Sequence, residues 1–304
     1  MAPFPSPTPT WHDNTYPSLS PTRPELSAKG KTVLITGGGT GIGAETARFF
    51  ARAGASRIAL LGRREQPLID TKASIESEHP GVDVFTASTD VTKKTEVDDA
   101  FARFAGDGKI HVVVSNAAIT GPLESVRDVD PDAFLNGVQS NLKGALYVAQ
   151  AFLRYAGEDA AAIDVNSSAA HLNFAAGFAS YSVAKWAQYR LWSSLGFANP
   201  QVRVYSIQPG VVDTDMNKAA GGVKAVGFED HVSLPASFNV WLASPEARFL
   251  KGKYLWVNWD VDELKARAKE IEEGTEFDLG LVGWPWGAPK FEFKLTADAE
   301  RQWS

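Results

Sequence analysis

From Lys31 onward, short apolar runs alternate with longer segments whose apolar residues recur at helical spacing. The apolar runs are rich in β-branched residues, which favours strands, and they occupy residues 31–36, 57–62, 82–88, 110–117, 161–167, 202–210 and 253–259. The clearest helical segments are 44–54, 96–106 and 144–157. Strands that alternate with helices predict an α/β fold, in which a doubly wound parallel sheet of about seven strands has helices on both faces.

The chain divides into three parts by composition. Residues 1–28 are rich in Pro, Ser and Thr and have no apolar periodicity, so we expect an extended or disordered N-terminal lead-in. The α/β pattern covers 29–260, and residues 261–304 hold most of a predicted C-terminal helix (260–274) and a Trp-rich tail. Strands covered on both faces are apolar throughout, so Asp164 in the fifth strand is an exception that the pattern does not explain.

Composition excludes several classes of protein. The net charge of -6 argues against nucleic acid or an anionic membrane as the main partner. The chain has no cysteine, which excludes disulfides, thiolate nucleophiles and Cys-ligated metals. No apolar run approaches the length that crosses a membrane, and the first residues lack the basic start and apolar run of a signal peptide. We therefore expect a soluble, cytoplasmic protein.

A glycine-rich loop, TGGGTGIG at 36–43, joins the first strand to the first helix. Gly37, Gly41 and Gly43 stand where a tight turn, a close approach to pyrophosphate and close helix packing each exclude a side chain. Phosphates would then meet the free N–H groups of the helix N-terminus. A plain turn also collects glycine, but the position between a strand and a helix favours the dinucleotide-binding loop of a Rossmann fold.

The end of the second strand bears on the choice of dinucleotide. An acidic residue there usually holds a free ribose 2′-hydroxyl, whereas an Arg accommodates a 2′-phosphate. Gly62 occupies the expected acidic position, and Arg63 and Arg64 follow it. These residues predict NADP(H), since Arg matches a phosphate with a planar fork of donors. The alternative is a solvated basic turn in which Glu65 neutralises one Arg.

Tyr181 and Lys185 are four residues apart in a helical segment, so they share one face. Ser168 directly follows the fifth strand and precedes Tyr181 by thirteen positions, while Asn116 lies at the end of the fourth strand and Asn141 on the helix that follows. Ligands bind at the carboxyl ends of parallel strands. Packing alone explains any one of these residues, but the set together favours acid–base chemistry.

With these residues assembled, the chain resembles the short-chain dehydrogenase/reductase family in its standard single-domain branch. The matching motifs, in the family's order and spacing, are TGGGTGIG, Asp90 in TDVT, SNAA, Asn141, Ser168, YSVAK and PGVVDT. The resemblance covers about residues 30–260. One departure is that SNAA has a second Ala where the family more usually has Gly, which adds only a methyl group.

The resemblance implies a role for each of four residues. Reduction of a carbonyl needs a hydride and a proton, and Tyr181 would be the general acid/base that supplies the proton. Lys185 would favour the phenolate of Tyr181 electrostatically and hold the nicotinamide ribose. Ser168 would hydrogen-bond the substrate oxygen, and Asn141 would position a water in a proton relay.

The resemblance also implies cofactor contacts. Asp90 would contact the adenine, Asn116 the adenine-side ribose, and the Val212 backbone with Thr214 the nicotinamide carboxamide. Asp90 has an alternative role as a turn or helix-cap residue. The full set expected to bind NADP(H) is Gly37, Thr40, Gly41, Ile42, Gly43, Arg63, Arg64, Asp90, Val91, Asn116, Tyr181, Lys185, Pro209, Gly210, Val212 and Thr214.

Two regions are expected to contact substrate. Residues 170–178 lie between Ser168 and Tyr181, and residues 215–235 correspond to a mobile lid in the family. Trp284 and Trp286 of the tail would either seal a large aromatic pocket or pack against a partner subunit. His171 would either bond a polar group of the substrate or remain solvated. The candidate pocket residues are His171, Phe174, Phe178, Phe228, Trp284 and Trp286, with Leu172 and His231 beside them.

These observations predict an NADP(H)-dependent oxidoreductase that interconverts a small-molecule ketone or aldehyde and its alcohol, in the reducing direction. The aromatic tail favours a bulky substrate, such as a specialised metabolite. One alternative is a dehydratase, epimerase or isomerase of the same family, and another is a non-catalytic cofactor-binding scaffold. We expect no metal. The family resemblance further implies a homodimer or homotetramer.

Overall fold

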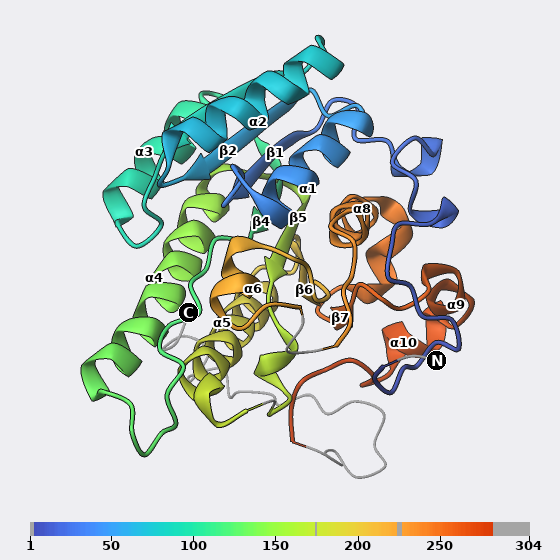
Figure 1. The fold of residues 1–304 in the computed structure, drawn as a ribbon. Coiled ribbons are helices and arrows are strands. Elements are labelled where there is room, and N and C mark those ends of the chain that lie inside the picture. Colours follow the sequence, from blue (N-terminus) through green and yellow to red (C-terminus); the bar gives the residue numbers. More distant parts are fainter. Residues whose placement is uncertain (1–2, 174, 224–226, 282–304) are drawn as a thin grey trace, which may run out of the picture.

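The computed structural model describes residues 3–173, 175–223 and 227–281. A parallel sheet in the order β3-β2-β1-β4-β5-β6-β7 forms its centre (Figure 1). The strands are β1 (Thr32–Thr36), β2 (Arg57–Gly62), β3 (Asp83–Ser88), β4 (Ile110–Ser115), β5 (Ala156–Val165), β6 (Arg203–Gln208) and β7 (Tyr254–Trp256). The predicted doubly wound α/β fold is confirmed.

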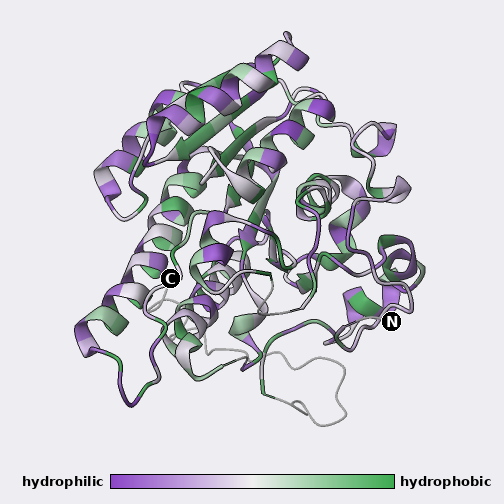
Figure 2. Ribbon diagram, in the orientation of Figure 1, coloured by the Kyte–Doolittle hydropathy of each residue, from purple (hydrophilic) through white to green (hydrophobic). Residues whose placement is uncertain are grey.

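Helices cover both faces of the sheet. One face packs on α1 (Gly41–Arg52), α2 (Glu65–Glu78) and α8 (Ser233–Leu242), and the other on α3 (Lys94–Ala105), α4 (Pro131–Tyr155) and α5 (Ala179–Ala198). Successive residues of a strand point to opposite faces, and this is why the enclosed strands are largely hydrophobic in Figure 2. Among the described residues, no helix combines the length and apolar character needed to cross a membrane.

Val33, Leu34 and Ile35 of β1 illustrate this double burial. Val33 and Ile35 belong to the core beneath α1 and α8, whereas Leu34 belongs to the core beneath α3, α4 and α5. All three side chains are 0% exposed. Since every strand runs in the same direction, the carboxyl ends of β1, β2, β4, β5 and β6 meet at one edge of the sheet. The candidate site residues follow these ends.

Two elements differ from the sequence-based expectation. Strand β5 begins at Ala156, directly after α4, and its pairing with β4 shifts register between Ile110 and Val112. The predicted C-terminal helix is divided into α9 (Val261–Ala266) and α10 (Ala268–Glu273). Arg267 separates them because its backbone leaves the helical conformation, with φ -110° and ψ 17°. Helical periodicity in a sequence does not reveal such a single-residue break.

The N-terminal segment, residues 3–28, packs on the domain, in contrast to the disordered or extended lead-in that its composition predicts. It forms two 3-10 helices, η1 (Pro17–Leu19) and η2 (Pro24–Leu26), whose Leu19 and Leu26 are 0% and 1% exposed. In Figure 1 this dark blue segment passes beside α9. Its apolar anchors and polar groups find partners in the C-terminal part of the chain, which local composition cannot indicate.

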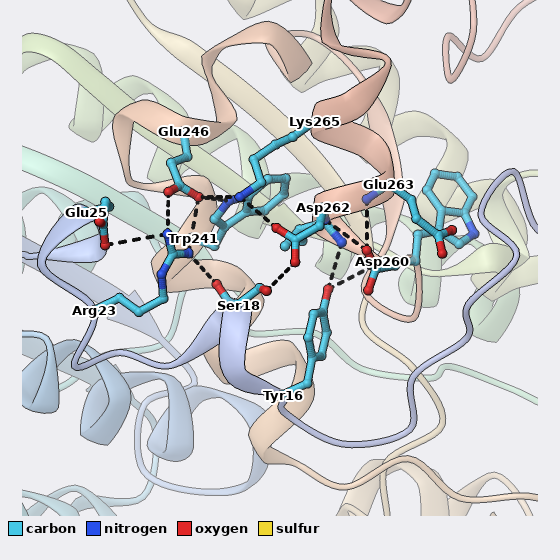
Figure 3. A network of polar contacts seen from close by, with 12 residues as sticks. Tyr16, Ser18, Arg23, Glu25, Trp241, Glu246, Asp260, Asp262, Glu263 and Lys265 are labelled. Atoms are coloured by element: carbon cyan, nitrogen blue, oxygen red, sulfur yellow. Dashed lines mark hydrogen bonds and ion pairs between the residues drawn. The ribbon is translucent and has the colours of Figure 1, made fainter.

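Figure 3 shows the polar contacts that hold this segment. The Tyr16 hydroxyl accepts a hydrogen bond from the backbone N–H of Val261 at 2.8 Å. The Arg23 guanidinium lies 2.7 Å from a carboxylate oxygen of Glu246. Ser18 donates to the carboxylate of Asp262, one of two acidic residues in the first turn of α9. The segment is therefore fixed at several points.

Candidate functional site

The glycine loop between β1 and α1 has several positions at which a side chain would not fit. Gly37 and Gly41 have φ values of +68° and +53°, which side-chain-bearing residues rarely adopt. A Cβ atom at Gly43 would lie 2.2 Å from the carbonyl oxygen of Gly37. A Cβ atom at Gly41 would lie 3.0 Å from Cγ2 of Thr214, so this glycine also permits the loop after β6 to approach. The loop and the N-terminus of α1 together form a cradle that fits a pyrophosphate.

Asn116 ties the end of β4 to this loop. Its Nδ2 donates to the carbonyl oxygen of Thr36 at 3.0 Å. In return, Thr36 Oγ1 accepts hydrogen bonds from the backbone N–H groups of Asn116 and Ala117, each at 3.0 Å. The side-chain amide predicted to contact a ribose thus supports the glycine loop. Thr40, at the N-cap of α1, and Ile42, in its first turn, complete the loop residues predicted to bind the cofactor.

The end of β2 carries the predicted cationic pair. Arg63 and Arg64 are exposed, and Arg64 lies 3.5 Å from the carboxylate of Asp215. Burial acts to raise the pKa of Asp90, but hydrogen bonds from Thr92 and the positive charges of Arg63 and Lys93 lower it overall. Asp90 therefore remains ionised near Arg63.

Asp90 also acts as a turn residue, which was the alternative role predicted for it. Its Oδ1 accepts from the N–H and the hydroxyl of Thr92 at 3.0 and 2.8 Å. The neighbouring Val91 is half-buried, and its Cγ2 would lie 2.9 Å from a Cβ atom at Gly144. The two predicted cofactor contacts thus follow the end of β3, and Val91 packs against α4.

Tyr181 and Lys185 share one face of α5, as their spacing predicts. Lys185 is only 2% exposed, and its Nζ lies 5.6 Å from the centre of the Tyr181 ring. The same Nζ donates to the carbonyl oxygen of Val165 at 2.9 Å. The ring of Phe178 meets the Tyr181 ring edge-on with the centroids 6.4 Å apart. The ammonium group is thus buried between the end of β5 and the Tyr181 ring.

Ser168 begins the 3-10 helix η3 (Ser168–Ala170) just beyond the end of β5 and is 2% exposed. Its backbone N–H donates to Oε1 of Gln208 at 2.8 Å. Gln208, the last residue of β6, is a positioning residue that the sequence-based set does not include. Its polar side chain at the end of a buried strand, directly before Pro209 and Gly210, is the signal that marks it.

Asn141 on α4 is 3% exposed and uses its whole side chain to hold the loop after β4. Its Oδ1 accepts from the N–H of Ile119 at 2.9 Å, and its Nδ2 donates to the carbonyl oxygens of Ile119 and Gly137 at 2.8 and 3.1 Å. The backbone carbonyl of Asn141 accepts from Gln188 Nε2 at 3.4 Å. The side chain thus positions a loop.

Asp164 within β5 is held through one of its two carboxylate oxygens. The residue is 0% exposed, and its Oδ2 accepts from Asn166 Nδ2 at 2.6 Å and from the Ser206 hydroxyl at 3.1 Å. Burial raises the pKa of its carboxyl, and the charge of Lys185 opposes this shift. Asn166 also donates to the carbonyl oxygen of Lys185 at 3.1 Å, so this polar group links β5 and β6 to the Lys185 turn of α5.

Asp230 organises the loop after β6 and was not predicted. The residue is 1% exposed, and its carboxylate accepts from the N–H of Val211 at 2.7 Å and from Asn258 Nδ2 at 2.9 Å. Gly210 has φ +85°, and a Cβ atom there would lie 2.7 Å from Oδ2 of Asp230. Burial raises the pKa of Asp230 to about 6, against these two donors.

The cofactor-binding residues predicted in this loop lie around Asp230. Pro209 is half-buried, and Val212 is 7% exposed. Thr214 caps α6 (Asp215–Ala219), since its Oγ1 accepts from the N–H of Asn217 at 3.2 Å. Asn217 in turn donates to the carbonyl oxygen of Val212 at 2.9 Å.

The predicted substrate residues divide into two groups. Phe174, Trp284 and Trp286 lie outside the described residues. His171 follows η3, and its Nε2 accepts from Trp256 Nε1 at 3.2 Å. His171 is exposed overall, and the partial desolvation of its ring lowers its pKa.

On the other side, Phe228 packs edge-on against Phe4 of the N-terminal segment, with ring centroids 5.7 Å apart. His231 Nδ1 lies 2.8 Å from the Ser233 hydroxyl. Leu172 is half-buried against the core beneath α1 and α8. These residues follow the carboxyl ends of β5 and β6, where the acid–base residues also lie.

The fold and these motifs are those of a dinucleotide-dependent oxidoreductase, and comparison with known proteins gives the family. The chain belongs to the short-chain dehydrogenase/reductase family, because the family model described as short chain dehydrogenase matches residues 31–222. Members of this family are oxidoreductases of CH–OH and C=O groups that bind a nicotinamide cofactor.

Curated relatives come from fungi. A short chain dehydrogenase/reductase of Claviceps purpurea is 33% identical over 284 residues, covering 92% of this chain and 95% of the relative. Short chain dehydrogenase/reductase AacuD of Aspergillus aculeatus is 32% identical, covering 92% of this chain and 98% of its own.

Solved structures are similar over most of the described fold. A short-chain type dehydrogenase/reductase from Mycobacterium ulcerans matches with a TM-score of 0.71 and 28% identity, covering 76% of this chain and 89% of that one. A short chain dehydrogenase from Burkholderia cenocepacia, determined in complex with NADP, matches with a TM-score of 0.70 and 26% identity, covering 77% of this chain and 99% of that one.

Proposed function

We propose that this protein is an NADP(H)-dependent reductase of a ketone or aldehyde, with Tyr181 as the general acid. The observation that carries the proposal is the buried ammonium of Lys185, 5.6 Å from the Tyr181 ring centre and 2% exposed. A charge in a dry environment acts strongly on its neighbour. Lys185 would stabilise the phenolate that remains after Tyr181 gives its proton to the substrate oxygen.

Two further residues support proton delivery. Ser168 stands at the end of β5, where its hydroxyl would hydrogen-bond the substrate oxygen and orient it toward Tyr181. Gln208 holds the Ser168 backbone at 2.8 Å, which keeps that residue in place. The side-chain amide of Asn141 is occupied by its hydrogen bonds with Ile119 and Gly137. We therefore infer that Asn141 contributes to proton delivery by fixing the loop after β4 and through its backbone carbonyl.

The glycine cradle between β1 and α1 fits the pyrophosphate of a dinucleotide, and bound NADP(H) would supply or accept the hydride. Arg63 would pair with the 2′-phosphate, and Asp90 would bond the adenine beside it. The exposure of Arg63 and its electrostatic influence on Asp90 support this assignment. The Burkholderia relative in complex with NADP supports it further.

We also propose that the protein forms a homodimer or homotetramer. The outer faces of α4 and α5 expose Leu135, Val183 and Trp186, which are 51%, 47% and 44% exposed. Apolar groups of this size on packed helices favour burial against another copy. Sedimentation of the wild type and of Trp186→Glu tests this proposal, since the charged variant should shift toward the monomer.

The function is tested by Tyr181→Phe, with Tyr155→Phe on α4 as the matched control. Tyr181→Phe removes only a hydroxyl, so we expect carbonyl-dependent oxidation of NADPH to fall by about 10²–10⁴-fold while the Kd for NADPH stays within about twofold. Tyr155→Phe should retain activity. Retained turnover in Tyr181→Phe would refute the assignment of the acid. Substrate conversion without net consumption of NADPH would instead point to a dehydratase, epimerase or isomerase.

A further inference from the structure

Four aromatic rings from three distant parts of the chain form one cluster. Phe4 of the N-terminal segment lies 5.1 Å from Trp256 and 5.7 Å from Phe228, measured between ring centroids. Trp11 lies 6.4 Å from Phe4 and 6.1 Å from Trp256. These separations lie within the range of favourable aromatic packing. We refer to Phe4, Trp11, Phe228 and Trp256 as the aromatic cluster.

The aromatic cluster reaches the candidate active site through His171. Trp256 ends β7, and its Nε1 donates to Nε2 of His171 at 3.2 Å. The ring centroids of His171 and Trp256 are 5.7 Å apart. Because His171 directly follows the 3-10 helix that begins at Ser168, the cluster adjoins the candidate active site.

The rings at the edge of the cluster are only partly covered. Trp256 is 6% exposed and supports the others, whereas Phe4, Trp11 and Phe228 are half-buried. Phe228 comes from the segment after β6 that corresponds to the family's lid. Phe4 therefore places an accessible aromatic surface beside the predicted substrate wall, and it does so from a part of the chain outside the α/β domain.

Hydrogen bonds fix the backbone next to the cluster to residues that follow β6 and β7. The N–H of His12 donates to the carbonyl oxygen of Asn258 at 2.9 Å, and Asn258 Nδ2 donates to the carbonyl oxygen of His12 at 2.9 Å. The same Nδ2 donates to Asp230, which holds Val211 of the loop after β6. The N–H of His231 donates to the carbonyl oxygen of Asp13 at 2.7 Å. The N-terminal segment is thus hydrogen-bonded to the segment after β6 and to the residues that follow β7.

We propose that Phe4 is a specificity-determining residue, and that the aromatic cluster receives an aromatic or bulky apolar group attached to the substrate carbonyl. This inference rests on the proposed carbonyl reductase function. A small aliphatic carbonyl would reach Tyr181 without touching the cluster. Phe4 thereby selects among substrates and takes no part in the chemistry.

Two diketones of matched chemistry test the proposal. Benzil carries two phenyl rings on the same dicarbonyl unit that carries two methyl groups in diacetyl. Binding of each to the protein saturated with NADP⁺ is measured by calorimetry, so that no turnover is needed. The variants are Phe4→Ala, which removes the ring, and Phe4→Tyr, which keeps it. Phe249→Ala is the control for lost packing, because this half-buried residue of η5 (Pro245–Leu250) precedes the amino end of β7, away from the site.

We expect Phe4→Ala to weaken benzil binding about tenfold through loss of an aromatic contact. Diacetyl and NADP⁺ binding should change by less than about twofold, and Phe4→Tyr and Phe249→Ala should bind benzil as the wild type does. Unchanged benzil affinity in Phe4→Ala would overturn the proposal, as would an equal loss in Phe249→Ala or for diacetyl. If the wild type binds NADP⁺ but no benzil, this inference fails and the proposed function stands. Failure to bind NADP⁺ would reject the proposed function itself.

Discussion

Lys185 holds its Nζ 5.6 Å from the centre of the Tyr181 ring, and the same atom donates a hydrogen bond to the end of β5. The helix supplies the spacing of the two residues, whereas the strand fixes where the ammonium stands. Because the ammonium is buried, its effect on Tyr181 is screened little by solvent or salt. We therefore expect activity to depend on this one charge.

Replacement of Lys185 by Met tests this dependence. Met has a similar length and no charge, so the helix should be retained while stabilisation of the Tyr181 phenolate is lost. We expect kcat to fall by about 10²–10⁴-fold, the usual contribution of acid–base catalysis. Steady-state kinetics with NADPH and diacetyl measures the change. Lys143→Met, on the exposed side of α4, is the control, and an equal loss in both variants would contradict a specific role.

Gly43→Ala tests the cofactor cradle. A Cβ atom there would lie 2.2 Å from the carbonyl oxygen of Gly37, so the loop must move. We expect NADPH affinity to fall at least about tenfold and the protein to lose about 1–3 kcal/mol of stability, as overpacking does. Gly81→Ala is the matched control because nothing lies within 4 Å of its Cβ position. If Gly43→Ala binds NADPH with the same Kd as the wild type, the loop is not the pyrophosphate site.

Arg63→Ala tests the choice of dinucleotide. A hydrogen bond to a charged group contributes about 1.5–3 kcal/mol, so the variant should bind NADPH about tenfold to a hundredfold more weakly. NADH has no 2′-phosphate, and its Kd should remain within about twofold of the wild-type value. Fluorescence titration of both cofactors measures this difference. Arg127→Ala, an exposed residue in the loop before α4, should change neither; tighter binding of NADH than NADPH by the wild type would refute the Arg63 assignment.

Asp230 predicts a pH dependence of stability. Its pKa is about 6 in the folded protein, whereas an unperturbed Asp titrates near 4. Between these values the folded state binds more protons at this site than the unfolded state does. This group therefore adds stability as the pH falls from about 7 toward 4, and the gain is lost as the pH rises through about 6. The full shift corresponds to about 3 kcal/mol.

Denaturant unfolding of the wild type and Asp230→Asn, at about pH 5 and about pH 7, checks this prediction. In the wild type, proton uptake by Asp230 raises the free energy of unfolding at about pH 5 relative to about pH 7. Asn cannot take up the proton, so the variant should lack this gain at the lower pH. Asp213→Asn, an exposed residue of the same loop, should keep the wild-type difference. An identical pH response of Asp230→Asn and the wild type would contradict the raised pKa.

The local sequence pattern was enough to predict most of the α/β domain. The apolar runs became buried strands because both faces of a parallel sheet are covered, and the glycine loop had its form dictated by steric exclusion at Gly37, Gly41 and Gly43. Tyr181 and Lys185 face the same side of α5 because four residues make about one helical turn. Each of these features depends on residues close together in the sequence.

The contacts that only the tertiary structure decided join residues far apart in the chain. Asp164 is accommodated by Ser206 of the neighbouring strand, and His171 meets Trp256. The N-terminal segment is ordered by partners such as Asn258, although its own composition resembles that of a flexible linker. The sequence by itself determined the fold class, the glycine loop and the shared helix face of Tyr181 and Lys185, whereas folding brought Phe4 against Trp256 and Asp230 against Val211. Such long-range pairing depends on strand order and packing, which local periodicity does not encode.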